Sequence, residues 1–210
     1  MKNKKIDKEE PNIFKIITLG DSYVGKTSIF KKYIYKSIGE TISTIGMNMF
    51  GKDLILDNNK KITLRLIDTA GTERYKALSK QYFKNTDAVL FVFAFDNIES
   101  FQNIKQWINI YSENNQTNVP KYLIGNKNDL EKNVSDVDIK DFLKLNKDFK
   151  FKSISAKNDD IKIDELFKEI GETLYQDFLK YGDKETKSIK IASSEDNKKS
   201  TCAISKCFLD

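Results

Sequence analysis

The sequence contains no histidine, and this absence excludes a large part of enzyme chemistry. Histidine is the usual general base near neutral pH and the commonest metal ligand, so histidine-based catalysis and histidine metal sites are ruled out. Cysteine is nearly absent too, because the only two, Cys202 and Cys207, lie close together at the C-terminal end. This placement is not that of a disulfide framework for a core, and we expect a reducing compartment.

Long apolar runs are also missing. The N-terminal residues MKNKKIDKEE lack the apolar segment of a signal peptide, and no stretch of about 18 apolar residues occurs in the chain. We therefore expect a cytoplasmic protein. The formal charge of +5 comes from 36 basic and 31 acidic residues that are mixed along the chain, so we expect no nucleic-acid partner.

The sequence does contain the apolar residues of a folded protein. Hydrophobic residues make up 39% and aromatic residues 11% of the 210 residues, which suits one domain with a tail. We predict a flexible extension over residues 1–11, one folded domain over 12–182 and a flexible tail, rich in lysine, serine and acidic residues, over 183–210.

Strand and helix patterns alternate along the predicted domain. Apolar runs typical of buried parallel strands occupy residues 12–20, 87–96, 121–126 and 149–154. Helical patterns occupy residues 26–35, 100–113, 136–146 and 163–180, with Ser100 as the expected N-cap of the second. Residues 47–68 predict a hairpin with a turn at Asp57 to Lys60, in which Asn58 and Asn59 tolerate a positive φ. The fold class predicted is α/β, with a mostly parallel sheet, one antiparallel strand and helices on both faces.

The segment GDSYVGKT, residues 20–27, matches the pattern GxxxxGK followed by Ser or Thr, and it lies between a predicted strand and a predicted helix, so it predicts a phosphate-binding loop. Its backbone amides are expected to surround a diphosphate at the positive end of the helix. Lys26 is expected to reach the β and γ phosphates, and the Thr27 hydroxyl to bind Mg²⁺. The predicted phosphate-binding residues of this segment are Ser22, Tyr23, Val24, Gly25, Lys26, Thr27 and Ser28.

Two later segments predict a pocket for a guanine base. In NKND, the carboxylate of Asp129 can accept hydrogen bonds from N1–H and the 2-amino group of guanine, whereas adenine has no such pair of donors. Asn126 and Lys127 would support the pocket. Alone, this segment is equally typical of a polar loop, but downstream of a phosphate-binding loop it indicates a nucleotide site. A second contribution is expected from SAK: Ser155, Ala156 and Lys157.

These motifs, together with TIGMNM, DTAGTERY, ALSKQYF and NIESFQNIKQWI, resemble the Ras superfamily of small GTPases, and its Rab branch most. The resemblance covers roughly residues 12–180 and implies a P-loop small G-domain with a six-stranded sheet that binds GTP or GDP with Mg²⁺. It implies that Thr44 binds Mg²⁺ and contacts the γ-phosphate, that Asp68 acts on Mg²⁺ through water, and that Gly71 senses the γ-phosphate.

The chain departs from the family pattern at Thr72, where the family usually has a glutamine that orients the attacking water. Threonine is shorter and carries a single hydroxyl. Together with Lys26 and Gly71, Thr72 forms the implied catalytic set, and we expect slow intrinsic hydrolysis because one lost polar group at a transition state costs about 3 kcal/mol. An activating protein that supplies its own glutamine would restore the rate.

Two of the three positions that present the family's shared effector surface also differ: Met49 and Ile67 stand where Phe and Trp are usual, whereas the third, Tyr82, is aromatic as expected. Effector identity therefore does not follow from the resemblance. GTP is expected to order the loops at 37–48 and 70–82, through which exchange factors, activating proteins and effectors bind. Trp107, the only tryptophan, is expected to pack rather than to act.

The tail provides the expected route to a membrane. Its lysines barely outnumber its acids, so electrostatic attraction alone is insufficient, and a prenyl chain would dominate. Cys207 fits a prenylation position and Cys202 a second one, although Asp210 is an unusual last residue. The alternative is a soluble tail. With lipid attached, we expect a monomer on the cytosolic face of an intracellular membrane.

The sequence leaves three functions open. The first is a Rab-like switch in vesicle traffic that cycles between GTP and GDP. The second is a GTP-locked module that binds effectors and hardly hydrolyses. The third is a P-loop ATPase or kinase, which Asp129 disfavours.

Overall fold

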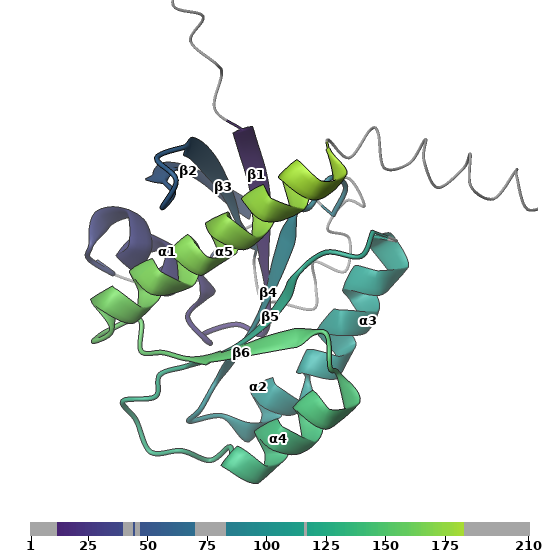
Figure 1. Cartoon of the computed structure of the whole chain (residues 1–210). Helices are drawn as coiled ribbons and strands as arrows, with labels where there is room; N and C mark the ends of the chain where they lie inside the picture. The colour runs from purple at the N-terminus through teal and green to yellow at the C-terminus, as the bar shows by residue number, and fades with distance from the viewer. Residues whose placement is uncertain (1–11, 40–43, 45–46, 70–82, 116, 183–210) are drawn as a thin grey trace, which may run out of the picture. The chain divides into compact units, whose positions relative to one another are not determined.

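The computed structural model describes residues 12–39, 44, 47–69, 83–115 and 117–182 (Figure 1). The chain divides into two units, residues 1–174 and 175–210, and the second is described only in the last turns of the final helix. The elements are β1 (Asn12–Leu19), α1 (Lys26–Tyr35), β2 (Met47–Ile55), β3 (Lys61–Thr69), β4 (Ala88–Ala94), α2 (Ile98–Gln102), α3 (Ile104–Asn114), β5 (Lys121–Asn126), α4 (Asp136–Leu145), β6 (Phe149–Ser153) and α5 (Asp160–Tyr181).

The strands form one six-stranded sheet in the order β2-β3-β1-β4-β5-β6. All neighbouring pairs are parallel except β2 and β3, which form the predicted hairpin. Its turn is closed by a hydrogen bond from the Leu56 amide to the Lys60 carbonyl, and Asn59 has a φ of 60°. Of the two asparagines expected in this turn, only Asn59 has a positive φ. The predicted α/β fold class is confirmed.

Helices cover both faces of this sheet. On one face α1 packs against the part of α5 that precedes residue 175, where the rings of Phe30 and Phe167 lie 5.9 Å apart (Figure 1). On the other face the buried aromatic residue Phe91 of β4 shares a core cluster with Trp107 of α3 and Phe142 of α4. The near-continuous apolar sequence of the central strands is explained by this burial on both sides.

The helical run after β4 begins earlier than expected. The N-cap is Asn97, whose side chain accepts a hydrogen bond from the Ser100 amide at 3.1 Å. The Ser100 hydroxyl lies inside α2, where it donates to the Asn97 carbonyl and accepts from the Ala94 amide. The expectation that Ser100 caps the helix is therefore wrong, because an equally good capping residue precedes it.

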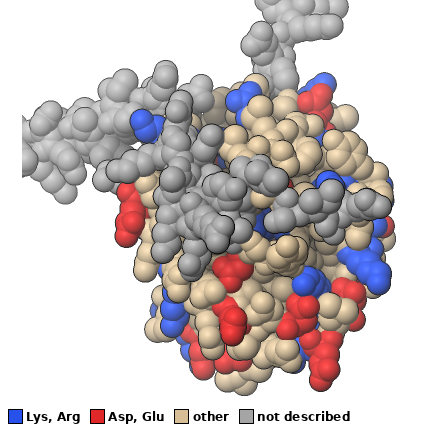
Figure 2. All heavy atoms as spheres, turned by 180° about the vertical axis from the view of Figure 1, so that it is seen from behind, with Lys and Arg blue, Asp and Glu red and all other residues tan. Residues whose placement is uncertain are grey.

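The described surface carries both signs of charge. Figure 2 shows lysine, arginine, aspartate and glutamate side chains interspersed over the described part of one face, without a broad basic area there. Within the ranges that the structure describes, no helix combines the length and the apolar character needed to cross a membrane.

The parallel strands bring the sequence motifs together. The carboxyl ends of parallel strands meet at one edge of a sheet, where ligands of this architecture bind. The loop after β1 contains the GDSYVGKT segment, the loop after β5 contains NKND, and the loop after β6 contains SAK. Three segments far apart in the sequence therefore share one edge.

Candidate nucleotide-binding site

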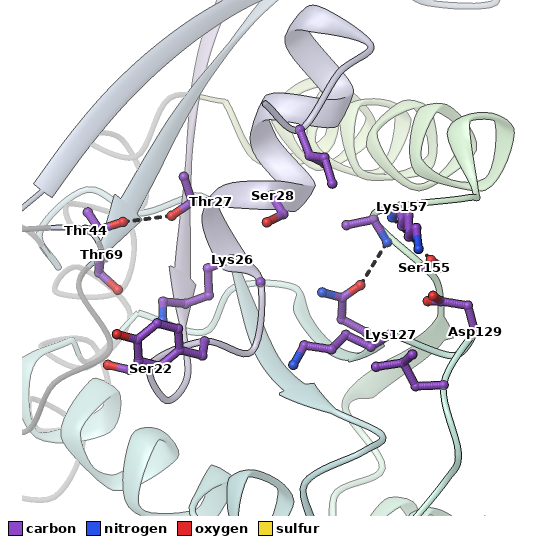
Figure 3. A pocket seen from close by; sticks show the side chains of 16 residues that line it. Ser22, Lys26, Thr27, Ser28, Thr44, Thr69, Lys127, Asp129, Ser155 and Lys157 are labelled. Carbon is purple, nitrogen blue, oxygen red and sulfur yellow. Dashed lines mark hydrogen bonds between the residues drawn. The ribbon is translucent and has the colours of Figure 1, made fainter. Parts of the chain in front are cut away.

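A cavity of about 450 Å³ opens at this edge, within the usual size range of ligand pockets (Figure 3). It is lined by residues from the loops after β1, β5 and β6 and from the segment after α1. The lining residues are Ser22, Tyr23, Gly25, Lys26, Thr27, Ser28, Ile38, Thr44, Thr69, Asn126, Lys127, Asp129, Leu130, Ser155, Ala156 and Lys157.

Two glycines allow the phosphate-binding loop to fold tightly. A Cβ atom on Gly20 would lie 2.1 Å from the Val92 carbonyl oxygen, and one on Gly25 would lie 2.2 Å from Nδ2 of Asn126. Gly25 is the N-cap of α1 and supplies no side-chain hydrogen bond there. An anion in the cavity can take that place and interact with the positive end of the helix.

The Lys26 side chain is buried and turns back onto its own loop. Its Nζ donates to the carbonyl oxygens of Gly20 and Asp21 at 2.9 and 2.7 Å. Burial lowers the pKa of Lys26 to about 8, opposed by the negative charges of Asp68 and Asp21. The cation is thus held beside the cavity by backbone oxygens.

Thr27, Thr44 and Asp68 form a connected set of oxygens. The Thr27 hydroxyl donates to Oδ2 of Asp68 at 2.6 Å and lies 2.8 Å from the Thr44 hydroxyl (Figure 3), which in turn donates to Asp68 Oδ2 at 3.4 Å. Asp68 is fully buried, and its Oδ1 has no hydrogen-bond partner among the described residues. Burial raises the pKa of Asp68, although hydrogen bonds and Lys26 oppose this.

This oxygen set fits Mg²⁺, which prefers hard oxygen ligands and keeps several waters. Across the described ranges no group of three or more His, Cys, Asp or Glu side chains could hold a metal. Two of the three groups here are the hydroxyls of Thr27 and Thr44, which also provide hard oxygen atoms. The unpartnered Oδ1 of Asp68 is the observation that favours a cation at this position.

On the other side of the cavity, Asn126 connects two loops. Its Nδ2 donates to the Val24 carbonyl at 2.7 Å, and its Oδ1 accepts from the Ala156 amide at 2.9 Å. The side chain is 1% exposed. Asn126 therefore fixes the phosphate-binding loop and the loop after β6 to each other.

The SAK loop has its own polar support. The Ser155 hydroxyl accepts from the amides of Lys157 and Asn158, both at 3.2 Å, and the Ser155 amide donates to Asp159 at 2.8 Å. Burial is the largest single influence on the pKa of Asp159 and raises it. The hydrogen bonds from Ser155 and Lys162 act in the opposite direction and together outweigh burial, so the pKa is lowered. The loop is therefore shaped without a ligand.

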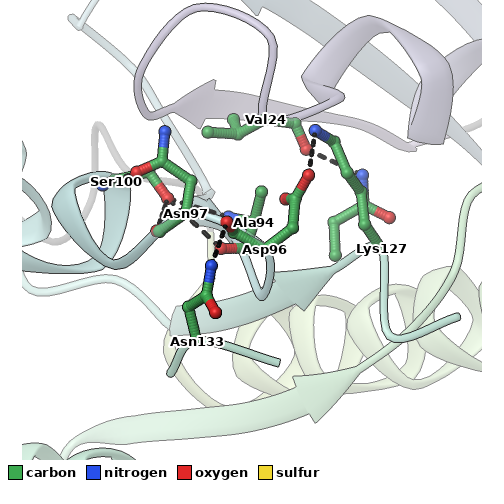
Figure 4. Close-up of polar contacts among 8 residues, drawn as sticks. Val24, Ala94, Asp96, Asn97, Ser100, Lys127 and Asn133 are labelled. Carbon is green, nitrogen blue, oxygen red and sulfur yellow. Dashed lines mark hydrogen bonds and ion pairs between the residues drawn. The ribbon is translucent and has the colours of Figure 1, made fainter. Parts of the chain in front are cut away.

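Lys127 is held from the rear of the cavity. It has a φ of 61°, and its Nζ pairs with Asp96 at 3.2 Å, as Figure 4 shows. The backbone carbonyl of Asp96 also accepts from Asn133 Nδ2 at 2.8 Å.

The neighbouring Asp129 lines the cavity, so its carboxylate is available to a base (Figure 3).

The structure brings most of the predicted nucleotide-site residues to one cavity. Val24 and Asp68 lie behind its wall. Of the predicted effector residues, Met49 is 61% exposed, whereas Ile67 is buried at 3%. The remaining predicted residues lie outside the described ranges: Gly71, Thr72, Tyr82, Cys202 and Cys207.

Three lining residues were not predicted: Ile38, Thr69 and Leu130. Thr69 and Leu130 directly follow Asp68 and Asp129, so adjacency to a motif was an available signal. Ile38 lies in the loop after α1, where the sequence has no pattern that marks it.

Comparison with known proteins agrees with this arrangement. Residues 15–176 match the model of the Ras family. The Ypt/Rab-type GTPase YPT7 of Saccharomyces cerevisiae is 32% identical, over 91% of this chain and 97% of its own length. The Ras-related protein SEC4 of the same yeast is 33% identical, over 76% of this chain and 74% of its own, and Rab-9A of Rattus norvegicus is 33% identical, over 70% and 76%. The chain therefore belongs to the Ras superfamily of small GTPases, in its Rab branch.

Proposed function

We propose that this protein is a Mg²⁺-dependent guanine-nucleotide switch of the Rab type, which hydrolyses GTP slowly and acts in vesicle traffic. As a member of its family the chain is a GTPase. The observation that carries the proposal is the single cavity shared by Lys26, Thr27, Asn126 and Asp129. It combines a phosphate-binding lysine with a carboxylate suited to guanine.

Base recognition is assigned to the loops after β5 and β6. The Asp129 carboxylate accepts from N1–H and the 2-amino group of guanine, a pair of donors that adenine lacks. The Ala156 amide would contact the guanine carbonyl, and the stem of Lys157 would pack against the ring. Because Asn126 already joins the loop after β6 to the phosphate-binding loop, little ordering is required when the base enters.

Phosphate binding is assigned to the loop after β1. Lys26 keeps its two backbone contacts and directs its remaining N–H toward the β and γ phosphates, while the loop amides and the start of α1 face the same oxygens. Thr27, Thr44 and Asp68 would hold Mg²⁺, which would neutralise charge that develops on the phosphates. Gly71 and Thr44 would contact the γ-phosphate.

Slow intrinsic hydrolysis is assigned to Thr72. Replacing it with glutamine places an amide in reach of the attacking water, so Thr72→Gln should accelerate single-turnover GTP hydrolysis about 100-fold. Thr72→Asn is the matched control, because it carries the same amide on a shorter side chain and should accelerate less. No acceleration in Thr72→Gln would refute the assignment.

The nucleotide carried by the purified protein tests the function itself. After denaturation, released GDP supports a cycling switch, and an adenine nucleotide refutes the proposal. Retained GTP favours the second candidate, an effector-binding module locked in the GTP state by Thr72.

Membrane attachment is part of the proposal. Prenylation of Cys207, with Cys202 as a second site, would place the protein on the cytosolic face of an intracellular membrane, since one or two lipid chains dominate weak electrostatic attraction. Intact mass of protein isolated from its own cells tests this, and an unmodified mass would refute it. The protein would be a monomer there, and its G-domain at 12–182 would bind exchange factors, activating proteins and effectors.

A further inference from the structure

Asp21 of the phosphate-binding loop is held by both of its carboxylate oxygens. Oδ1 accepts from the indole Nε1 of Trp107 at 2.7 Å, and Oδ2 accepts from Nδ2 of Asn103 at 2.8 Å. Both donors belong to one element, because Asn103 is the N-cap of α3 and Trp107 lies on its first full turn. The carboxylate is thus fixed from behind the cavity.

The backbone of Asp21 faces the phosphate side of the same loop. Its carbonyl oxygen accepts from Lys26 Nζ at 2.7 Å, beside the Gly20 carbonyl at 2.9 Å. Gly20 in turn is pressed against strand β4, since a Cβ there would lie 2.1 Å from the Val92 carbonyl. The two oxygens that position Lys26 are therefore set by β4 and by α3.

Helix α3 also gains from this contact. It has no acidic residue in its first turn, and Asn103 makes no side-chain capping bond to it. The Asp21 carboxylate supplies negative charge at this positive end. Trp107 is 6% exposed within a cluster of core side chains, so its indole is held firmly in place.

We propose that Trp107 and Asn103 are positioning residues of the phosphate site, which act through Asp21 to hold Lys26 against the bound phosphates. The inference rests on the proposed nucleotide function. Helix α3 would then slow the release of the nucleotide, in addition to packing in the core.

The first test is the rate at which a fluorescent GDP analogue dissociates in Mg²⁺. Trp107→Phe keeps an aromatic ring and removes the donor, and it should raise the rate about tenfold, as expected for one hydrogen bond to a charged group. Asn103→Ala tests the same role outside the core and should raise the rate severalfold. Tyr111→Phe is the matched control, because it removes a hydroxyl from the same helix that bonds to Asn115 and not to Asp21.

A double-mutant cycle separates positioning from general packing. In an Asp21→Ala background, Trp107→Phe should change the dissociation rate no further, because the group through which it acts is gone. Trp107 is the only tryptophan, so Asp21→Ala should also shift its fluorescence emission. Additive effects in the cycle, or a Trp107→Phe rate equal to that of Tyr111→Phe, would overturn the proposal.

Nucleotide binding by the wild-type protein separates a failure of the proposed function from a failure of the role of α3. Wild-type protein that binds no guanine nucleotide would refute both the proposed function and this inference. Wild-type protein that binds GDP normally, with variants that release it no faster, would refute only the role of α3.

Discussion

The loops after β5 and β6 form one side of the cavity, and the loop after β1 forms the other with Thr44, behind which Asp68 is buried. On the guanine side, Asn126 and Ser155 already make the hydrogen bonds that shape the pocket, and their partners are backbone groups. On the phosphate side, Lys26 is turned to its own loop, and one oxygen of Asp68 has no partner among the residues described.

This difference separates recognition from switching. A preformed guanine side selects the base at little cost in ordering. The phosphate side holds the buried charges of Lys26 and Asp68, for which phosphate and Mg²⁺ would be the missing partners. The free energy of this side therefore depends on whether the ligand is bound. Mutations on the guanine side should therefore destabilise the empty protein, whereas mutations on the phosphate side should mainly affect binding.

The largest effect is expected for Lys26→Met. It removes charge-assisted hydrogen bonds worth about 1.5–3 kcal/mol each, so GDP affinity should fall about 1000-fold by calorimetry. The free energy of unfolding of the nucleotide-free protein should change much less, because removal of a desolvated charge offsets the loss of its two carbonyl contacts. Lys144→Met, on exposed α4, is the control. A clearly less stable empty variant would contradict the comparison.

Asn126→Ala should weaken GDP binding about 100-fold and also destabilise the empty protein. The change leaves the Val24 carbonyl and the Ala156 amide unpaired, at about 1–3 kcal/mol for each group. Chemical denaturation of the nucleotide-free protein measures the second effect. Asn128→Ala is the neighbouring control, since its side-chain contacts are long, at 3.3 and 3.4 Å. Equal stability of Asn126→Ala and wild type would show that this side is not preformed.

Asp68→Asn should abolish most of the effect of Mg²⁺ on nucleotide release. In the wild type, chelation of Mg²⁺ should accelerate GDP release about tenfold, which is the change in rate expected when one charge-assisted contact is lost. In the variant the two rates should agree closely. Asp53→Asn, which removes a charge from an exposed ion pair on β2, should behave as the wild type. A full Mg²⁺ effect in Asp68→Asn would place the cation elsewhere.

The smallest effect is expected for Ser155→Ala. Two amides lose their acceptor, so the empty protein should lose about 1 kcal/mol and GDP should dissociate a few times faster. Ser135→Ala is a control of the same chemistry, because Ser135 caps α4 away from the cavity and should cost about 1 kcal/mol of stability without changing GDP release. Identical release rates for both variants would remove Ser155 from the site.

The sequence predicted the fold and most of the cavity because each motif is local. GDSYVGKT lies between a strand and a helix, and NKND and SAK follow strands, so parallel pairing brings them to one edge. The bond between Asn126 and Val24 joins residues 102 positions apart, and no local pattern indicates it. The early start of α2 was missed because Asn97 competes with Ser100 as a cap, and only packing decides between them.

The bridge made by Asn126 has a consequence for biosynthesis. Chains are made from the N-terminus, so the phosphate-binding loop leaves the ribosome long before Ala156 does. Until then one oxygen of Asn126 lacks its backbone donor, and the guanine pocket has no far wall. Tight nucleotide binding during translation would thus require that nearly the whole domain has left the ribosome and folded.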